Sequence, residues 1–243
     1  MGFGTEKVEE EIASLFPNVK IERLDFDTAR TRTAYERIIA DFEKGKTQIL
    51  IGTQMLSKGL DFGNVSVVGI LNADNLMNFP DFRAHERAFQ LMVQVSGRAG
   101  RRDKRGTVVL QTSQPEHPLI QMVGRFAYKE MVRMQLSERS MFRYPPYYRL
   151  IVIVLRSRND SVLQELSQIY AETLRKRLGE RVLSPVTPPI TRVQTLHIRK
   201  IILKIEIAAA ITPVRDILEK VYAEMQRYLP FKQLIVHYDV DPV

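Results

Sequence analysis

The sequence predicts an α/β lobe built on a parallel sheet, followed by a smaller α+β domain. In the first half, short apolar runs alternate with amphipathic helical patterns, which is the rhythm of a parallel sheet with helices on both faces. Near Pro145 and Pro146 the pattern changes, and adjacent prolines are typical of a domain boundary. A length of 243 residues allows two modest domains, since one domain takes roughly 150 residues. We therefore predict one domain at residues 1–140 and a second at residues 141–243.

Apolar spacing predicts the elements of the first half. Positions from Thr5 to Phe16 and from Tyr35 to Phe42 repeat at helical spacing, and Gly45 is placed to end the second of these helices. The remaining helices are predicted at residues 81–94 and 119–138, and short apolar strands at residues 19–24, 48–51, 65–71 and 107–111.

The second half has a different order of elements. It reads strand, helix, strand, strand, helix, strand, at residues 150–155, 162–178, 182–186, 195–207, 214–229 and 233–240. This is the order of a split βαβ fold, also called ferredoxin-like.

Composition restricts the class of protein. Lys and Arg number 36 against 28 Asp and Glu, and a net charge of +8 favours a polyanionic partner such as nucleic acid, although many soluble proteins are basic without binding one. The absence of cysteine excludes disulfides and thiolate metal sites, and with only four scattered histidines we predict no metal site. No apolar run approaches the ~18 residues of a membrane span, and no secretion signal opens the chain, so we expect a cytoplasmic protein.

One motif match is rejected on its context. Residues 40–47 read Ala-x-x-x-x-Gly-Lys-Thr, one residue away from a phosphate-binding Walker A loop. Such a loop must follow a strand and open a helix, so that the helix N-terminus faces the phosphates. Here Gly45-Lys46-Thr47 ends a helix and precedes a strand, and we predict no phosphate site there.

A polar loop with two glycines and a lysine follows the strand predicted at residues 48–51. In open α/β sheets, ligands gather at the carboxyl ends of strands. Thr53 and Gln54 offer short hydrogen-bonding side chains suited to a backbone phosphate. Gly59 permits close approach of a ligand, and Asp61 can accept from a ribose or from water. Taken alone, the loop also fits an ordinary connection between two strands.

A second candidate loop lies at residues 94–102, where Arg98 and Arg101 stand three apart and can reach the same side. The planar, permanently charged guanidinium suits bidentate contact with a γ-phosphate and with the charge that spreads over it during transfer. A basic turn of this kind is otherwise a solvated surface or a nucleic-acid contact. Its place after a strand end next to the first loop favours the phosphate interpretation.

Together these segments resemble the second RecA-like lobe of a superfamily two helicase, with residues 52–62 as motif V and residues 94–101 as motif VI, Gln-x-x-Gly-Arg-x-Gly-Arg. A narrower resemblance is to the PriA family of replication-restart DNA helicases. It rests on residues 2–6, 23–28, 52–59, 80–87 and 114–118, and more loosely on residues 144–147, 185–192 and 239–242. Asn72 departs from the family, which commonly has aspartate there, and residues 196–200 lack the family's aromatic-basic run.

The resemblance implies an ATP-dependent 3'-5' DNA helicase that recognises and remodels stalled replication forks for primosome assembly. It also implies three groups of site residues. They are Arg98 and Arg101 as catalytic arginine fingers, Gly59, Asp61 and Gln94 at ATP, and Thr53, Gln54 and Lys58 at DNA.

The cofactors and partners are likewise implied by the family. They are ATP and Mg²⁺ in the whole protein, Zn²⁺ on cysteines just upstream of residues 2–6, forked, single-stranded or duplex DNA, single-stranded DNA-binding protein and primosome proteins, with no membrane. A Walker A lysine and an acidic Mg²⁺-binding motif are not found, so we expect a piece of a longer protein that is inactive alone. The alternatives are another superfamily two translocase and a non-enzymatic binding module.

Overall fold

The computed structural model describes residues 4–53, 56, 62–63, 65–100 and 106–242. By its internal contacts the chain divides into two compact units, Met1–Val132 and Arg133–Val243. The limit predicted after residue 140 lies near the end of helix α6 (Tyr128–Met141), and it stays a prediction.

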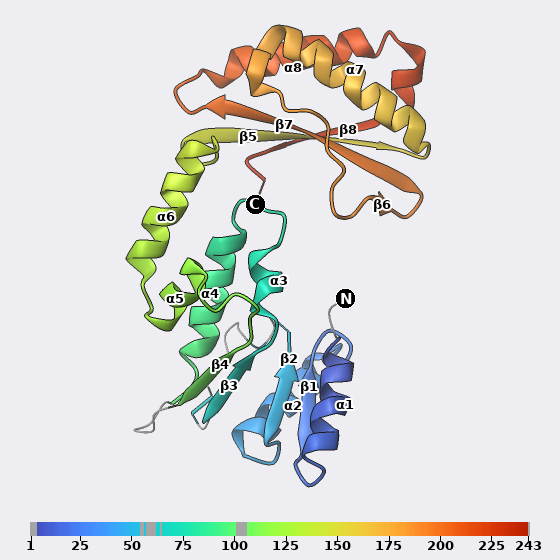
Figure 1. The fold of residues 1–243 in the computed structure, drawn as a ribbon. Coiled ribbons are helices and arrows are strands. Elements are labelled where there is room, and N and C mark those ends of the chain that lie inside the picture. Colours follow the sequence, from blue (N-terminus) through green and yellow to red (C-terminus); the bar gives the residue numbers. More distant parts are fainter. Residues whose placement is uncertain (1–3, 54–55, 57–61, 64, 101–105, 243) are drawn as a thin grey trace. The chain divides into compact units, whose positions relative to one another are not determined.

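The first unit contains two pairs of parallel strands (Figure 1). The pairs are β1 (Ile21–Leu24) with β2 (Ile49–Gly52), and β3 (Val67–Ile70) with β4 (Thr107–Leu110). The predicted parallel pairing is therefore confirmed. Among the described residues, the hydrogen bonds form two separate two-stranded sheets rather than one continuous sheet.

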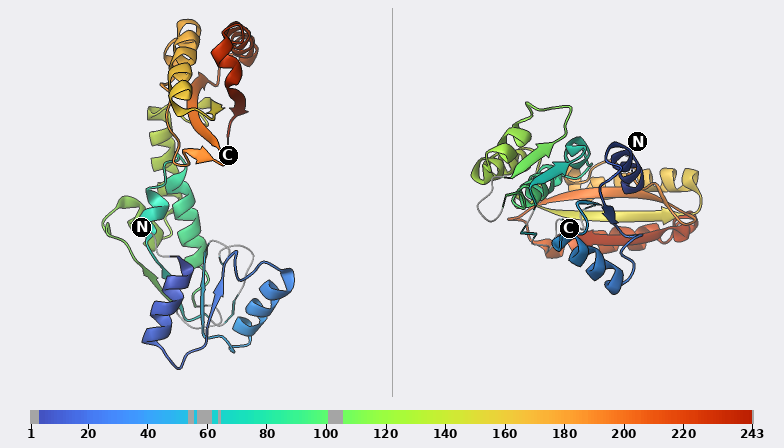
Figure 2. Two further views of the ribbon diagram at one scale, coloured as in Figure 1. Left: turned by 90° about the vertical axis from the view of Figure 1, so that its right-hand side faces the viewer. Right: turned by 90° about the horizontal axis from the view of Figure 1, so that it is seen from below.

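Helices cover these strands. They are α1 (Thr5–Leu15), α2 (Arg32–Glu43), α3 (Ala73–Met77), α4 (Ala84–Ser96) and α5 (Pro118–Gly124). Figure 2 shows α1 and α2 on opposite sides of the pair formed by β1 and β2, as predicted for helices on both faces. The buried side chains of Leu24, Ile38 and Phe62 form the core between α2 and the strands.

The near match to a Walker A loop has the predicted context. The N-cap Thr31 accepts a hydrogen bond from Ala34 N at 3.2 Å and starts α2. The helix ends before Gly45, whose φ of 71° requires the left-handed region. Lys46 Nζ then lies 3.3 Å from Asp41 Oδ1, and Thr47 Oγ1 donates to Glu22 at 2.6 Å. This segment therefore closes a helix and leads into β2.

Three local differences from the predicted elements have physical reasons. The stretch predicted as one helix at 119–138 is two helices, α5 and α6, because Phe126 takes a φ of 53° between them. Asn72, also with φ 53°, caps the unpredicted helix α3 by accepting from Asn75 N at 3.3 Å. Helix α4 begins at residue 84 rather than 81, because Asp81 Oδ1 accepts from Arg83 N at 2.8 Å in a turn before it.

The second unit is a four-stranded antiparallel sheet in the order β6-β7-β5-β8. Its strands are β5 (Tyr148–Ser157), β6 (Arg192–Val193), β7 (Leu196–Glu206) and β8 (Ile235–Val240), and its helices are α7 (Asp160–Leu178), α8 (Ile211–Met225) and the short 3-10 turns η2 (Gly179–Arg181) and η3 (Leu229–Gln233). Helices α7 and α8 lie on one face of the sheet (Figure 1).

The strand predicted at residues 182–186 is reduced to two isolated antiparallel bridges, Val182 with Leu203 and Val186 with Lys200. Pro185 lies between them and has no N–H to donate, so a continuous ladder cannot form there. The segment still lies along β7, on the side away from β5, as the second strand of a split βαβ fold must.

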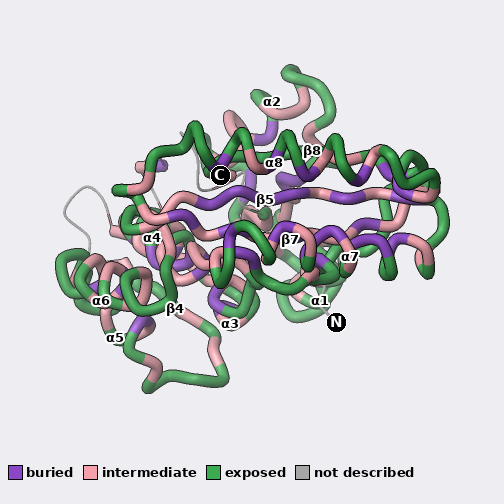
Figure 3. Tube along the Cα trace, turned by 90° about the horizontal axis from the view of Figure 1, so that it is seen from above, coloured by how far each residue is buried: buried purple, intermediate pink, exposed green. Residues whose placement is uncertain are grey.

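Alternate residues of the central strands face the helices and form the core of the second unit. Those of β5 and β7 are Ile151, Ile153, Leu155, Ile201, Leu203 and Ile205. Figure 3 shows β5 with buried residues along most of its length. The hydroxyl groups of Tyr170 and Tyr238 hydrogen-bond to each other beneath α7, and burial raises the pKa of the Tyr170 phenol above its ordinary value.

A buried carboxylate joins α1 to the turn that follows β1. The Asp25 side chain, in a residue only 7% exposed, accepts from Thr5 Oγ1 at 2.6 Å and from Thr28 N at 2.9 Å, and lies 3.1 Å from Arg23 Nε. Burial alone would raise the pKa of Asp25, but the hydrogen bonds from Thr5 and Thr28 and the Arg23 charge outweigh it and lower the pKa to about 2.

We predict that this carboxylate makes the stability of the first unit depend on pH. Because the folded pKa of about 2 is below the ordinary value of 3.8, its stabilisation is full above that value and is lost as the pH falls from there through about 2. Replacing Asp25 by Asn should lower the free energy of unfolding by about 1–3 kcal/mol near neutral pH. Urea unfolding over a range of pH measures the difference.

Asp27→Asn is the matched control. Among the described residues the Asp27 side chain forms an exposed ion pair with Arg30, and loss of that pair should change the free energy of unfolding by less than about 1 kcal/mol. Wild type and Asp25→Asn should converge in stability towards about pH 2. A difference of the same size at acidic and neutral pH would contradict the ionised role of Asp25.

Candidate functional site

The first candidate loop starts where two parallel strands end side by side. Leu24, the last residue of β1, is the register partner of Gly52, the last residue of β2. A Cβ atom added to Gly52 would lie 2.6 Å from Leu24 O and 2.7 Å from Leu56 Cδ1. Because a backbone oxygen cannot move aside, only glycine fits there. The position of the next residue, the exposed Thr53, is therefore fixed by the strand pair.

The far end of this loop is anchored in the core. Phe62 is buried and meets the Phe42 ring edge-on, with 4.8 Å between ring centroids. Between these ends, Gln54, Lys58, Gly59 and Asp61 lie outside the described residues. The roles assigned to them from the sequence therefore stay predictions.

Helix α4 presents the second loop. After its C-cap Gly97, Arg98 N donates to Val95 O at 3.1 Å and Ala99 N to Ser96 O at 3.2 Å, so a turn follows the helix directly. Arg98 therefore lies in this turn, four residues after Gln94 of α4. Gln94 is exposed and Arg98 is half-buried. Arg101 lies outside the described residues.

Two backbone contacts hold the arginine loop against the sheet. Gly100 N donates to Val65 O at 3.1 Å, with a Gly100 φ of 81°. A Cβ atom added to Gly106, just before β4, would lie 2.6 Å from Ala99 Cβ and closer still to the Ala99 carbonyl carbon and Gly100 N. Gly106 could not be recognised from the sequence, because no periodicity or motif distinguishes a glycine needed for close approach.

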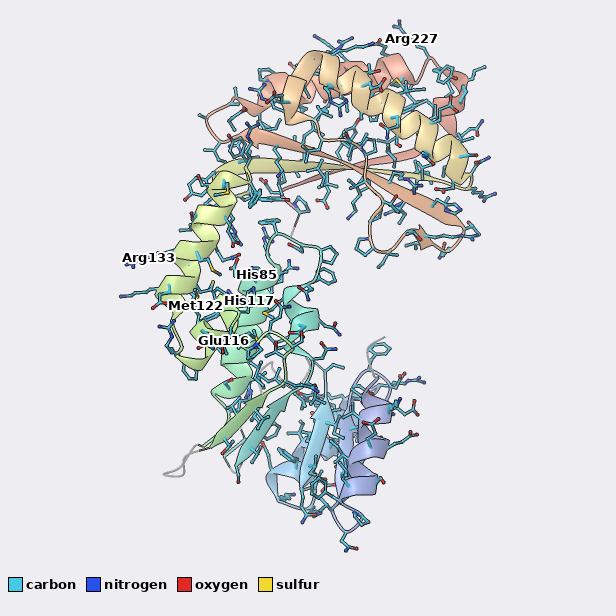
Figure 4. All side chains as sticks on the ribbon, in the orientation of Figure 1. His85, Glu116, His117, Met122, Arg133 and Arg227 are labelled. Carbon is cyan, nitrogen blue, oxygen red and sulfur yellow. The ribbon has the colours of Figure 1, made fainter. Side chains whose placement is uncertain are left out.

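Helix α4, which carries Gln94 and ends just before the turn with Arg98, is packed along its length. Its residues Ala88, Phe89 and Met92 are buried. Arg87 Nη1 lies 2.9 Å from Asp81 Oδ2 near its start. There His85 and His117 also pack edge-on, with ring centroids 5.5 Å apart (Figure 4). These contacts make α4 a rigid support for the loop.

A further carboxylate fixes the segment that follows β4. Asp74 of α3 accepts from Ser113 Oγ at 2.6 Å, from Ser113 N at 2.9 Å and from Thr112 Oγ1. The hydrogen bonds from Ser113 and Thr112 lower the pKa of Asp74. All of its described partners are structural, so we assign Asp74 no chemical role.

The described candidate residues offer hydrogen-bond donors and positive charge that suit a phosphate. Thr53 supplies a hydroxyl after β2, Gln94 an amide on α4, and Arg98 a guanidinium in the turn after α4. Within the described ranges, no group of three or more His, Cys, Asp or Glu could hold a metal ion. No helix in this part of the chain has the length and apolar character to span a bilayer.

Two family models match the chain. The helicase conserved C-terminal domain matches residues 4–103, and the primosomal protein N C-terminal domain matches residues 140–243. The first match confirms the predicted RecA-like second lobe. A solved structure of the C-terminal domain of the DEAD-box protein Dbp5 is similar only at a TM-score of 0.36 and 16% identity, over 56% of this chain and 78% of that one, which supports no further argument.

The chain is also similar to curated proteins called replication restart protein PriA. The one from Bacillus subtilis (strain 168) is 35% identical over 243 residues, covering 99% of this chain and 30% of the relative. Those from Haemophilus influenzae and Synechocystis sp. are 36% and 39% identical, covering 99% and 79% of this chain and 33% and 23% of the relatives. The chain thus spans about a third or less of the length of these relatives, and it belongs to the PriA family.

Proposed function

We propose that this chain is the second motor lobe and C-terminal domain of an ATP-dependent DNA helicase that moves 3'-5' and remodels stalled replication forks for primosome assembly. The observation that carries the proposal is the position of Arg98, in the turn that directly follows a packed helix and on a loop bonded to Val65. The names of the relatives support the link to replication restart.

In the proposed enzyme, Arg98 and Arg101 lie at the γ-phosphate of ATP, and Gln94, Gly59 and Asp61 complete this side of the nucleotide site. ATP with Mg²⁺ supplies the phosphoryl bond whose hydrolysis drives movement. The guanidinium groups hold the negative charge that grows on the phosphoryl oxygens, because their fork matches two oxygens at once. Arg98, on a fixed backbone, fits this role without rearranging the loop.

The remaining parts of the nucleotide site come from a first lobe outside this chain, which supplies the Walker A lysine and the acidic Mg²⁺ ligand. Closure of the two lobes on the nucleotide aligns the arginines, and opening releases product. Thr53, Gln54 and Lys58 hold the DNA backbone, so that each cycle moves the strand. By this proposal the chain alone does not hydrolyse ATP.

The proposal also includes the wider setting. The whole protein acts in the cytoplasm, and it binds Zn²⁺ through cysteines upstream of the residues of this chain. Its partners are forked DNA, single-stranded DNA-binding protein and other primosome proteins. The names of the relatives support replication restart as the shared process.

We predict that Arg98→Ala, and separately Arg101→Ala, in the whole protein lowers DNA-stimulated ATP turnover roughly 1,000-fold or more, because an arginine finger acts on the transition state. Affinity for forked DNA should stay unchanged. Steady-state ATPase assays and fluorescence anisotropy measure the two quantities. Arg125→Ala, at an exposed arginine paired with Glu130, is the control and should turn over like wild type.

Three results would contradict parts of this proposal. Undiminished turnover in both arginine variants refutes the finger assignment. No DNA-stimulated turnover in wild type favours a non-enzymatic binding module. Unwinding of RNA forks in preference to DNA forks, in strand-displacement assays, favours another superfamily two translocase.

We also predict that Gly106→Ala lowers turnover about tenfold or more at unchanged DNA affinity, since displacement of a catalytic group by about 1 Å is that costly. The added Cβ would collide with the backbone of Ala99 and Gly100 next to Arg98. Gly69→Ala is the matched control, because a Cβ there meets nothing within 4 Å and the residue pairs with Val109 of β4. Equal turnover of the two variants would show that the close approach does not position Arg98.

A further inference from the structure

The turn after β1 holds the most exposed large hydrophobic side chain of the described residues. Phe26 is 81% exposed, although the residue before it, Asp25, is only 7% exposed. The residue after it, Asp27, forms an exposed ion pair with Arg30. A single exposed aromatic is common on protein surfaces. Phe26 differs from such residues because hydrogen bonds fix the backbone of its turn while its ring stays exposed to solvent.

The backbone on both sides of Phe26 is fixed by hydrogen bonds. Asp25 Oδ1 accepts from Asp27 N at 3.0 Å and from Thr28 N at 2.9 Å, and Ala29 N donates to Asp25 O at 3.0 Å. Thr28 Oγ1 donates back to Arg23 O, in β1, at 2.8 Å. With Thr5 and Arg23 also holding the Asp25 carboxylate, the turn cannot fold Phe26 inward without breaking this network.

The position of the turn points to a ligand. Phe26 follows the carboxyl end of β1, and Thr53 follows the carboxyl end of β2, with Leu24 and Gly52 paired across a strand spacing of about 4.8 Å. Thr53 is a residue that our proposed function places at the DNA backbone. An aromatic ring and a phosphate-binding loop therefore emerge from the same edge.

Positive charge follows within the same connection. The side chains of Arg30 and Arg32 are 71% and 91% exposed, and their ion pairs within the described part of the chain are with the exposed carboxylates of Asp27 and Glu36. Exposed pairs of this kind are weak, so a phosphate can replace the carboxylate partner. A rigid aromatic platform next to cations is the arrangement that binds single-stranded nucleic acid, where bases stack on the ring and phosphates meet the cations.

We propose that Phe26 stacks on a base of single-stranded DNA held at the carboxyl edge of β1 and β2, with Arg30 and Arg32 beside its phosphates. This deepens the proposed function and rests on it for the place of the strand at Thr53. Duplex DNA does not fit the same contact, because its base faces are covered by neighbouring base pairs. The alternative is that another part of the longer protein packs over the Phe26 ring.

The chain contains no tryptophan and nine tyrosines, so Phe26→Trp places its only indole at the proposed contact, and excitation at the long-wavelength edge of the absorption selects that indole over the tyrosines. Titrating the 243-residue chain with an oligothymidylate of about 20 nucleotides should quench this fluorescence, since indole stacks on bases as phenyl does. Phe16→Trp is the matched control: Phe16 is 51% exposed, but it lies between α1 and the amino end of β1. Its fluorescence should not change.

Affinity gives the second measurement. Phe26→Ala should weaken binding of the labelled oligonucleotide roughly tenfold, with the dependence on salt unchanged, because stacking is lost while the phosphate contacts remain. Phe26→Trp should restore the affinity. Arg30→Ala with Arg32→Ala should instead reduce the salt dependence. Melting temperatures of all variants, without DNA, show whether each one folds like wild type.

Several outcomes overturn the inference. They are failure of the wild-type chain to bind the oligonucleotide, equal quenching of both tryptophans, and equal binding by Phe26→Ala and wild type. A lower melting temperature of the whole protein carrying Phe26→Ala, with unchanged DNA affinity, would show that Phe26 packs against another part of that protein. None of these touches the ATPase test of Arg98, so failure of the stacking contact and failure of the proposed helicase are distinguishable.

Discussion

Parallel strands end at the same edge of a sheet, and β1 and β2 do so with Leu24 beside Gly52. The pairing requires the backbone at Gly52 to approach Leu24 O more closely than any side chain would allow. It therefore brings the turn at residues 25–28 and the loop that starts at Thr53 to one place, although 24 to 27 residues separate them in sequence. Everything proposed for DNA at this edge depends on that register.

The two candidate loops are also linked to each other through the backbone. Gly100 N donates to Val65 O, and Val65 belongs to the connection that begins at Thr53 and leads into β3. The arginine loop is thus bonded to the far end of the loop that carries the proposed DNA contacts. In the proposed mechanism, a shift of Arg98 has a short covalent and hydrogen-bonded route to that connection, which is a physical link of the kind that coupling requires.

Much of the fold could be predicted because periodicity reports burial directly. The helical spacing at Ile38 and Ile39 predicted the face of α2 that turns to its core, and the apolar run at residues 150–155 predicted the strand β5. Phe126 and Gly106 could not be predicted in this way. A residue with positive φ or a glycine needed for close approach depends on what lies next to it in space, which a single sequence does not specify.

The residues of the candidate site likewise fall into those that a sequence pattern indicates and those that only the fold brings together. Sequence spacing predicted that Arg98 and Arg101 reach the same side, and this stays a prediction because Arg101 lies outside the described residues. The network around Asp25 was missed, because Thr5, Arg23 and Thr28 come from a helix, a strand and a turn that only the fold brings together. For Gly59, Asp61 and Arg101, which lie outside the described residues, the assigned roles rest on the family motifs alone.

The half-burial of Arg98 also explains why a second lobe is needed for the proposed chemistry. Near a protein surface, the attraction between a guanidinium and a phosphate is several times weaker than in a site closed to water. Gln94 and Thr53 are exposed here, and nothing described in this chain covers them. In the proposed mechanism, an arginine on a turn fixed by backbone hydrogen bonds becomes effective when another surface closes over it.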